Sequence, residues 1–233
     1  LLRPETASFV GGYEMPVCYG LTCGELAEMM NAELGCGCDL QIVPCANLTR
    51  ACTFRDWGHY WVTPSLGIPR FETALLYPGT CLIEGTNLSE GRGTSDPFAI
   101  LGAPFIRAEG FSRAFNALGC PGVEATPMYF VPTTSKHQGT LCGGIQLHIL
   151  DEREIRPVAM GVKLLDLLRR MYPADFRFLD PVRQDGKPFI SLLAGHRDFE
   201  NPAWDADTLL ARYDAESRAF RERKAAYERY TKE

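Results

Sequence analysis

The chain has 233 residues, enough for one large domain or two small ones. Hydrophobic residues make up 45% and charged residues 23%, which is the balance of an ordinary globular protein. The formal net charge of −5 argues against nucleic acid as the main partner, because phosphate binding needs a basic face. The longest apolar stretch, residues 97–106, is too short to span a bilayer.

The first third of the chain predicts a helix, a strand and an aromatic segment. Thr22 and Glu25 have the spacing of a capping box, so a helix is expected to begin there and to end at Gly35. Residues 40–43 have the apolar pattern of a strand. Residues 46–67 are rich in turn formers and aromatic side chains.

The rest of the chain alternates between helical and strand patterns, which predicts the α/β class. Helices are expected at about Pro69–Leu76, with Pro69 in the first turn, and at residues 112–118, 158–171 and 208–232. Strands are expected at residues 81–83, 98–101, 126–131 and 141–150. The long last helix is expected to face the core and to pack on the sheet, and binding to a partner is the alternative. A domain boundary near residues 64–69 divides residues 1–68 from residues 69–233.

Polar groups gather in a glycine-rich loop after the apolar run 81–83. The loop contains a carboxylate, a carboxamide, a guanidinium and hydroxyls, from Glu84, Asn87, Ser89, Glu90, Arg92, Thr94 and Asp96. Functional groups tend to lie on loops at strand ends, and glycines let the backbone approach a ligand. The loop therefore predicts a site for a polyhydroxylated or anionic small molecule. The alternative is a structural loop whose polar groups cap one another.

Four blocks of the chain, in order, resemble segments of one known family. They are SFVGGYEMPVCYGLTCGELAEMMN (Ser8–Asn31), CDLQIVPC (Cys38–Cys45), PSLGIPRFETALLYPGTCLIEGTNLSEGRGT (Pro64–Thr94) and KHQGTLCGGIQLHI (Lys136–Ile149). The family is that of the NamZ-type exo-β-N-acetylmuramidases, which are bacterial peptidoglycan glycosidases. The chain departs from the family pattern at Leu66 and Gly67, where the family usually has Pro and Asn, and at Tyr19 and Leu48.

The resemblance implies an architecture and an activity. Residues 1–68 are expected to be the end of a Rossmann-like domain, and residues 69–233 a smaller α/β domain with a mixed sheet and a long C-terminal helix. The first part of the Rossmann-like domain, with an acidic motif expected to supply the main catalytic carboxylate, is expected to precede Leu1. The resemblance implies a hydrolase that releases N-acetylmuramic acid in cell wall recycling, incomplete for catalysis as this fragment.

Each polar residue has an expected role in that chemistry. Glycoside hydrolysis usually needs two carboxyl groups, and Glu84 is the best candidate for one of them. Arg92 is expected either to bind the lactyl carboxylate of N-acetylmuramic acid or to fix the loop to a carboxylate such as Glu84. The expected substrate contacts are Asn87, Glu90, Arg92, Thr94 and His137. Asp96 is expected to start a turn before Pro97.

Other features leave alternatives open. Trp57, Tyr60 and Trp61 can contact a sugar or pack in a core. Of the nine cysteines, Cys81 and Cys142 are expected in the core, and the Cys36–Cys38 pair is weak evidence for zinc. No cofactor is expected. A non-catalytic sugar-binding module is the second hypothesis, and an enzyme with a cysteine nucleophile is the third. The family points to the periplasm or secretion, whereas nine cysteines fit a reducing cytosol.

Overall fold

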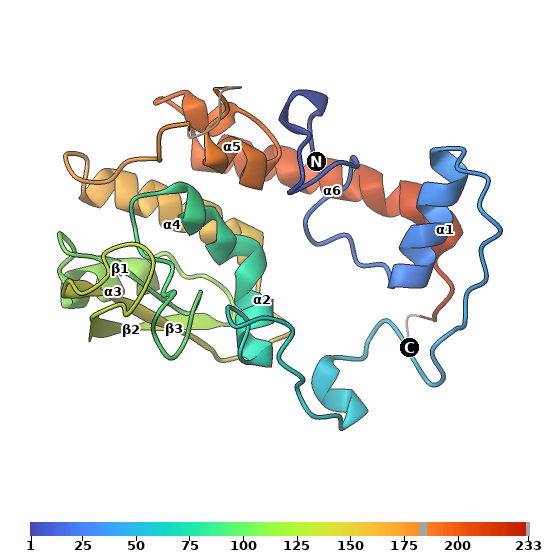
Figure 1. Ribbon diagram of the computed structural model, residues 1–233, viewed down its shortest axis with the longest axis horizontal. Coiled ribbons are helices and arrows are strands. Elements are labelled where there is room, and N and C mark those ends of the chain that lie inside the picture. Colours follow the sequence, from blue (N-terminus) through green and yellow to red (C-terminus); the bar gives the residue numbers. More distant parts are fainter. Residues whose placement is uncertain (182–185, 232–233) are drawn as a thin grey trace. The chain divides into compact units, whose positions relative to one another are not determined.

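The computed structural model describes residues 1–181 and 186–231 (Figure 1). The chain forms two compact units. Unit 1 contains Leu1, residues 15–60 and residues 212–233, and unit 2 contains residues 2–14 and 61–211. Short 3-10 helices occur at Pro4–Thr6, Phe54–Trp57, Cys81–Gly85, Asp198–Glu200 and Ala225–Tyr227.

Unit 1 contains the first predicted helix. Helix α1, Cys23–Glu33, begins at a capping box in which the Thr22 hydroxyl accepts a hydrogen bond from Glu25 N at 3.3 Å. The Glu25 carboxylate in turn accepts one from Thr22 N at 2.7 Å. Gly35 follows the helix with a left-handed φ of 60°. The predicted start and end of this helix are confirmed.

The last part of helix α6, Ala206–Lys224, packs in unit 1. Phe220 joins Leu21 and Met29 in a buried apolar cluster. Charged side chains add to the packing, because Glu25 is fully buried and paired with Arg50. The last predicted helix therefore faces a core, as expected, but Phe220 packs against Leu21 and Met29 rather than on the sheet. The α-helix ends at Lys224 and a 3-10 turn follows it, while the predicted end at residue 232 lies outside the described residues.

The predicted strand at residues 40–43 is wrong. These residues have no regular secondary structure, and the Val43 side chain is 92% exposed. A strand is defined by its hydrogen bonds to a neighbour, and the described residues supply no neighbour here. The apolar pattern of this segment is typical of a strand, but the described residues provide no neighbouring strand with which it could pair.

Unit 2 is built on a three-stranded sheet with the order β1-β3-β2. The strands are β1 (Ile100–Ala103), β2 (Val123–Phe130) and β3 (Cys142–Ile149), and both pairings are antiparallel. Within the described residues the sheet is antiparallel, so the predicted mixed sheet is wrong. Chain order explains this, because β2 and β3 are consecutive and a short connection between neighbouring strands forces them to run in opposite directions.

Helix α3, Ala108–Asn116, covers the outer edge of β2. The Asn116 side chain accepts a hydrogen bond from Ala125 N at 2.8 Å and donates one to Ala125 O at 3.0 Å. The Ser112 hydroxyl donates to the same carbonyl at 2.8 Å. These bonds satisfy backbone groups that an edge strand would otherwise leave open. The helix is longer than the predicted 112–118 segment and begins four residues earlier.

Helices α2 (Phe71–Thr80) and α4 (Pro157–Met171) pack against each other in unit 2 (Figure 1). Their backbones approach closely at Gly79 and Gly161, where a Cβ added to Gly79 would lie 1.8 Å from Pro157 O. The predicted α4 is confirmed nearly residue for residue. Helix α2 begins after Arg70, so Pro69 lies outside it rather than in its first turn.

The predicted strand at residues 81–83 is also wrong. Helix α2 continues directly into the 3-10 helix Cys81–Gly85, which carries Glu84. A short buried apolar run does not reveal by its pattern whether it is strand or helix. Here helical packing decides, because Gly85 lies against the backbone of Ile190 in helix α5, Phe189–Ala194.

The predicted boundary at residues 68/69 stays a prediction. The compact units divide at residues 1/2, 14/15, 60/61 and 211/212, because the C-terminal residues pack with residues 15–60. Across the described ranges, 1–181 and 186–231, no helix is both long and apolar enough to cross a membrane.

Candidate functional site

The glycine-rich loop of unit 2 has a backbone that only glycine allows at two positions. Gly91 and Gly93 have φ angles of 78° and 80°. A Cβ on Gly91 would lie 2.3 Å from Ile100 O, and a Cβ on Gly93 would lie 2.5 Å from Thr134 N. The two glycines therefore allow the loop backbone to lie in close contact with β1 and with the β2–β3 connection. Arg92 lies between the two glycines in the sequence.

Arg92 joins the two glutamates of the loop. Its Nη2 donates to Glu84 Oε2 at 3.1 Å, and its Nε lies 3.2 Å from Glu90 Oε1. The Glu90 side chain is 3% exposed, whereas those of Glu84 and Arg92 are 17% and 41% exposed. The prediction that Arg92 fixes the loop to Glu84 is therefore observed. The guanidinium is still open enough to meet a ligand.

Lys136 completes this charged cluster, and the sequence interpretation missed it. Its Nζ donates to the backbone carbonyls of Ile83, Glu84 and Leu88 at 3.0, 3.2 and 2.9 Å. The ammonium also lies 3.0 Å from Glu90 Oε2, as an ion pair without the direction of a hydrogen bond. Burial lowers the pKa of Lys136, and the carboxylates of Glu90 and Glu84 oppose that shift. The signal in the sequence was its place next to His137 in the KHQG block.

Asn87 and His137 tie the loop to its neighbours. The Asn87 amide donates to Asp175 O at 2.8 Å and accepts from Arg177 N at 3.0 Å. His137 Nε2 lies 2.8 Å from Asn87 O. Both side chains have protein partners, so these contacts hold the loop in shape. Their predicted roles in substrate binding stay predictions.

Thr94 and Asp96 organise the end of the loop. The Thr94 hydroxyl donates to Gly91 O at 2.6 Å and accepts from Asp96 N at 3.2 Å. Asp96 O accepts from Ile100 N at 3.0 Å, which closes the expected turn. The buried Asp96 carboxylate is paired with Arg70. Thr94 is thus a turn residue in this structure, and its contact with a substrate stays a prediction.

Tyr77 and Phe98 form an aromatic side of the cluster that the sequence interpretation did not include. Their rings meet edge to face at 4.8 Å, and the Arg92 guanidinium lies 5.1 Å from the centre of the Phe98 ring. Burial, followed by the charge of Glu84, raises the pKa of Tyr77. The phenol therefore stays protonated at neutral pH. Tyr77 is 37% exposed, and the charge of Glu84 acts on its hydroxyl.

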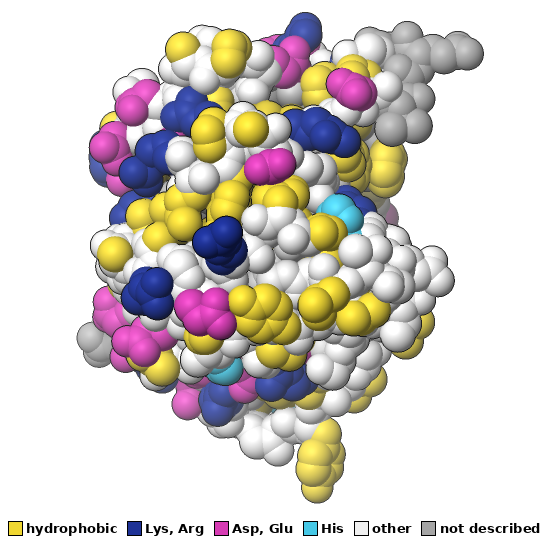
Figure 2. All heavy atoms as spheres, turned by 90° about the vertical axis from the view of Figure 1, so that its left-hand side faces the viewer, with side chains coloured by type: hydrophobic (Ala, Val, Ile, Leu, Met, Phe, Trp, Pro, Cys, Tyr) yellow, Lys and Arg dark blue, Asp and Glu magenta, His cyan; other side chains and the backbone are white. Residues whose placement is uncertain are grey.

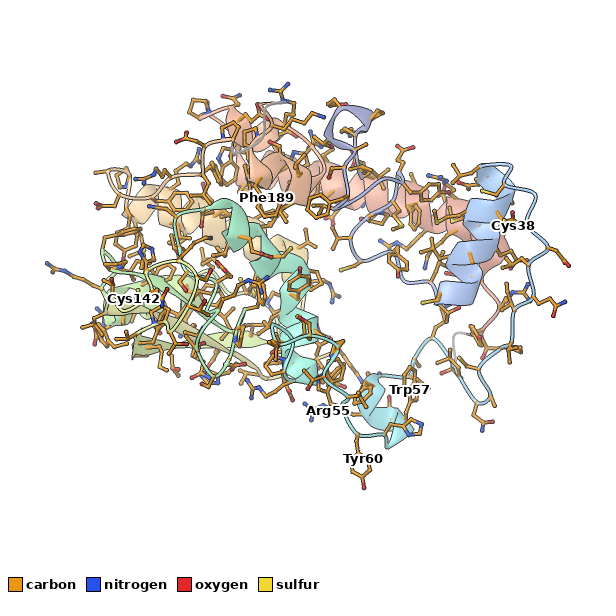
Figure 3. All side chains as sticks on the ribbon, in the orientation of Figure 1. Cys38, Arg55, Trp57, Tyr60, Cys142 and Phe189 are labelled. Atoms are coloured by element: carbon orange, nitrogen blue, oxygen red, sulfur yellow. The ribbon has the colours of Figure 1, made fainter. Side chains whose placement is uncertain are left out.

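The other predicted features lie apart from this cluster. Trp57 and Tyr60, in unit 1, are 48% and 93% exposed, and Tyr60 projects away from the ribbon in Figure 3, so neither is a core residue here. Trp61, in unit 2, packs against Phe71 with ring centres 5.8 Å apart. A cavity of about 530 Å³ in unit 1 is lined by Cys45, Ala46, Asn47, Leu48, Cys52, Asp56, Trp57 and His59.

Cysteines and surface charge give no further site. Cys81 and Cys142 are buried, which confirms their expected place in the core, and none of the nine cysteines forms a disulfide. In residues 1–181 and 186–231, no three His, Cys, Asp or Glu side chains are arranged to hold a metal ion. On the face drawn in Figure 2, basic and acidic side chains are interspersed among hydrophobic ones.

Comparisons with known proteins agree along nearly the whole chain. The family described as Exo-beta-N-acetylmuramidase NamZ, C-terminal, matches residues 75–230, and its N-terminal counterpart matches residues 1–72. A curated relative from Bacillus subtilis (strain 168), named Peptidoglycan beta-N-acetylmuramidase NamZ, is 44% identical over 179 residues. That alignment covers 77% of this chain and 43% of the relative, so the chain spans less than half of the relative's length.

Two solved structures of DUF1343 family proteins from Bacteroides fragilis NCTC 9343 share the fold. The first has a TM-score of 0.86 at 25% identity, and the second has 0.74 at 27%. They cover 99% and 100% of this chain, which covers 62% of each of them. The two family matches and the 44% identical relative show that the chain belongs to the NamZ exo-β-N-acetylmuramidase family.

Proposed function

We propose that the protein to which this chain belongs is an exo-acting glycoside hydrolase that releases terminal β-linked N-acetylmuramic acid from peptidoglycan fragments. Membership of the family and 44% identity to a peptidoglycan β-N-acetylmuramidase support the hydrolase class. The site supports the sugar, because a carboxylate, a phenol and a guanidinium lie together on one loop and the helix before it. The cell envelope, where peptidoglycan lies, is the proposed location.

The observation that supports the proposed substrate is the guanidinium of Arg92, whose Nη1 group is available to bind a ligand. Its Nε and Nη2 are used by Glu90 and Glu84, and Nη1 has no hydrogen-bond partner within the described part of the chain. N-Acetylmuramic acid carries a lactyl carboxylate, which N-acetylglucosamine lacks. A guanidinium already held by two protein carboxylates loses little freedom when it binds a third. Arg92 is therefore proposed to select muramic acid.

Glu84 is proposed as one of the two carboxyl groups of the reaction. It lies near the end of the 3-10 helix Cys81–Gly85, is 17% exposed and is held by Arg92. Hydrolysis of a glycosidic bond usually requires a second carboxyl group on the other side of the bond. We assign that group to a part of the protein outside these 233 residues, since the chain spans 43% of its curated relative. Residues 1–68 would then be the end of a Rossmann-like domain.

A non-catalytic sugar-binding module is the second candidate. It is favoured by the pairing of both loop carboxylates with the same guanidinium, which leaves neither of them unpaired. In that case the site would bind muramic acid without cleaving it. The two candidates share the ligand and differ in turnover.

The test compares a full-length version of the protein with this chain. The full-length enzyme should hydrolyse a chromogenic β-N-acetylmuraminide and leave the matching N-acetylglucosaminide nearly untouched. The 233-residue chain alone should show no comparable turnover. Binding of the muraminide without hydrolysis by the full-length protein would support the module. Equal hydrolysis of both sugars would contradict the proposed role of Arg92.

A further inference from the structure

Lys136 has the most constrained environment of the charged cluster. The two residues that flank it, Ser135 and His137, have left-handed φ angles of 68° and 58°. Non-glycine residues are rarely held in this region, and surrounding bonds must stabilise them there. Here the Ser135 hydroxyl donates to Glu90 Oε1 at 3.4 Å, and His137 contacts Asn87 O. The β2–β3 connection is therefore shaped to insert Lys136 into the glycine-rich loop.

The hydrogen bonds of Lys136 are fully used. An ammonium has three N–H donors, and the three backbone carbonyls at 2.9–3.2 Å accept them. Two of these carbonyls belong to Ile83 and Glu84, in the 3-10 helix that carries the candidate catalytic carboxylate. Lys136 therefore has no donor left for a substrate, and it acts on the protein itself.

Lys136 makes the number of positive charges in the cluster equal to the number of negative ones. Two carboxylates, Glu84 and Glu90, face two cations, Arg92 and Lys136. Glu90 is 3% exposed, so its charge needs partners inside the protein. Lys136 supplies one of them, at 3.0 Å from Oε2, and Arg92 contacts the other oxygen with Nε alone. Nη2 of Arg92 is thereby left for Glu84.

We propose that Lys136 is a positioning residue, which neutralises Glu90 so that Arg92 can hold Glu84, and which fixes the backbone of Glu84 through its carbonyl. This inference rests on the proposed function, because it assigns Lys136 a part in the same reaction. Without the ammonium, the buried Glu90 carboxylate would draw Arg92 into a two-pronged pair. The Arg92–Glu84 bond would then be lost.

The test uses three variants of the full-length protein: Lys136→Met, Glu90→Gln and the double variant. Lys136→Met should lower kcat on the order of 100-fold, the loss expected when a reacting group is displaced by about 1 Å. Glu90→Gln should lower it only a few-fold, since Arg92 then has no competing buried carboxylate. The double variant should be more active than Lys136→Met, because removing both charges ends the competition. Lys163→Met, a partly exposed lysine on α4, is the control and should keep wild-type activity.

A second readout is independent of activity. Crystal structures of wild type, Lys136→Met and the double variant should show the Arg92–Glu84 bond present, broken and restored. If the Arg92–Glu84 bond is broken and restored in this way but the full-length protein cleaves no muraminide, the positioning role of Lys136 is supported and the proposed function is contradicted. If Lys136→Met does not fold, the double variant and Glu90→Gln decide. The inference is overturned if the Arg92–Glu84 bond is lost in either of them. It is also overturned if the fold-loss of kcat in the double variant equals the product of the losses in the two single variants.

Discussion

The close approach of α2 and α4 makes a sharp prediction at Gly79. Alanine there would place its Cβ 1.8 Å from Pro157 O and 2.6 Å from the carbonyl carbon, both backbone atoms that no rotamer change can move. Ordinary contact for a Cβ begins at 3.4 Å, so the helices must separate by roughly 1.5 Å at the crossing, which removes part of their packing. Overpacking of this kind costs about 1–3 kcal/mol, and the backbone clash favours the upper end.

For a chain of this size, each kcal/mol lowers Tm by about 2–4 °C, so Gly79→Ala should melt roughly 6–12 °C early in a thermal scan followed by circular dichroism. The matched control is Gly110→Ala, in the first turn of α3, where an added Cβ meets nothing within 4 Å. That change should be neutral or stabilising by about 0.5–1 kcal/mol, because alanine favours the helix. If Gly79→Ala has the same Tm as Gly110→Ala, α2 and α4 do not approach each other closely at Gly79.

Three further predictions concern the site and the pH dependence of stability. In the full-length protein, Glu84→Gln should lower kcat about 100-fold or more while Tm changes by only a few degrees; early melting with normal kcat would make Glu84 structural. Arg92→Ala should weaken muraminide binding by roughly 1.5–3 kcal/mol, and Arg92→Lys by less; equal weakening of N-acetylglucosamine analogues would contradict direct recognition. Burial raises the pKa of Glu25, but hydrogen bonds from Arg229 N, Thr22 N and Arg50 outweigh it and leave the pKa below its ordinary value. Stability from Glu25 is therefore present above the unfolded-state pKa and is lost as the pH falls through the lowered one. Acid melting curves should show this loss, and Glu25→Gln should show less of it.

The local chemistry of several elements could be predicted from the sequence. The capping box at Thr22 and Glu25 determines the start of α1, because both hydrogen bonds form between residues three apart. The amphipathic pattern of residues 158–171 and the apolar pattern of residues 141–150 likewise predicted α4 and β3. In each case the deciding interactions lie within a few residues or follow a clear period.

Two elements depended on partners that are distant in the sequence. Residues 81–83 are apolar enough for a strand, but packing against α5 and continuity with α2 make them helical. Residues 40–43 have a strand pattern and no strand beside them in the described chain, so they stay irregular. Local patterns report which side chains are apolar, whereas hydrogen-bonded neighbours decide whether a strand exists.

In the site, too, some features follow from the local sequence and others from contacts between distant residues. The sequence by itself determined that Glu90 and Arg92 lie on a glycine-rich loop directly after the segment that carries Glu84, since glycine is needed where φ is positive and the backbone is crowded. It also determined the family, through four blocks in order. Only the tertiary structure decided that Lys136, 46 residues after Glu90, inserts its ammonium among the carbonyls of that loop. The physical reason is that a buried charge is stabilised by whatever opposite charge the fold brings near, and sequence spacing does not determine that distance.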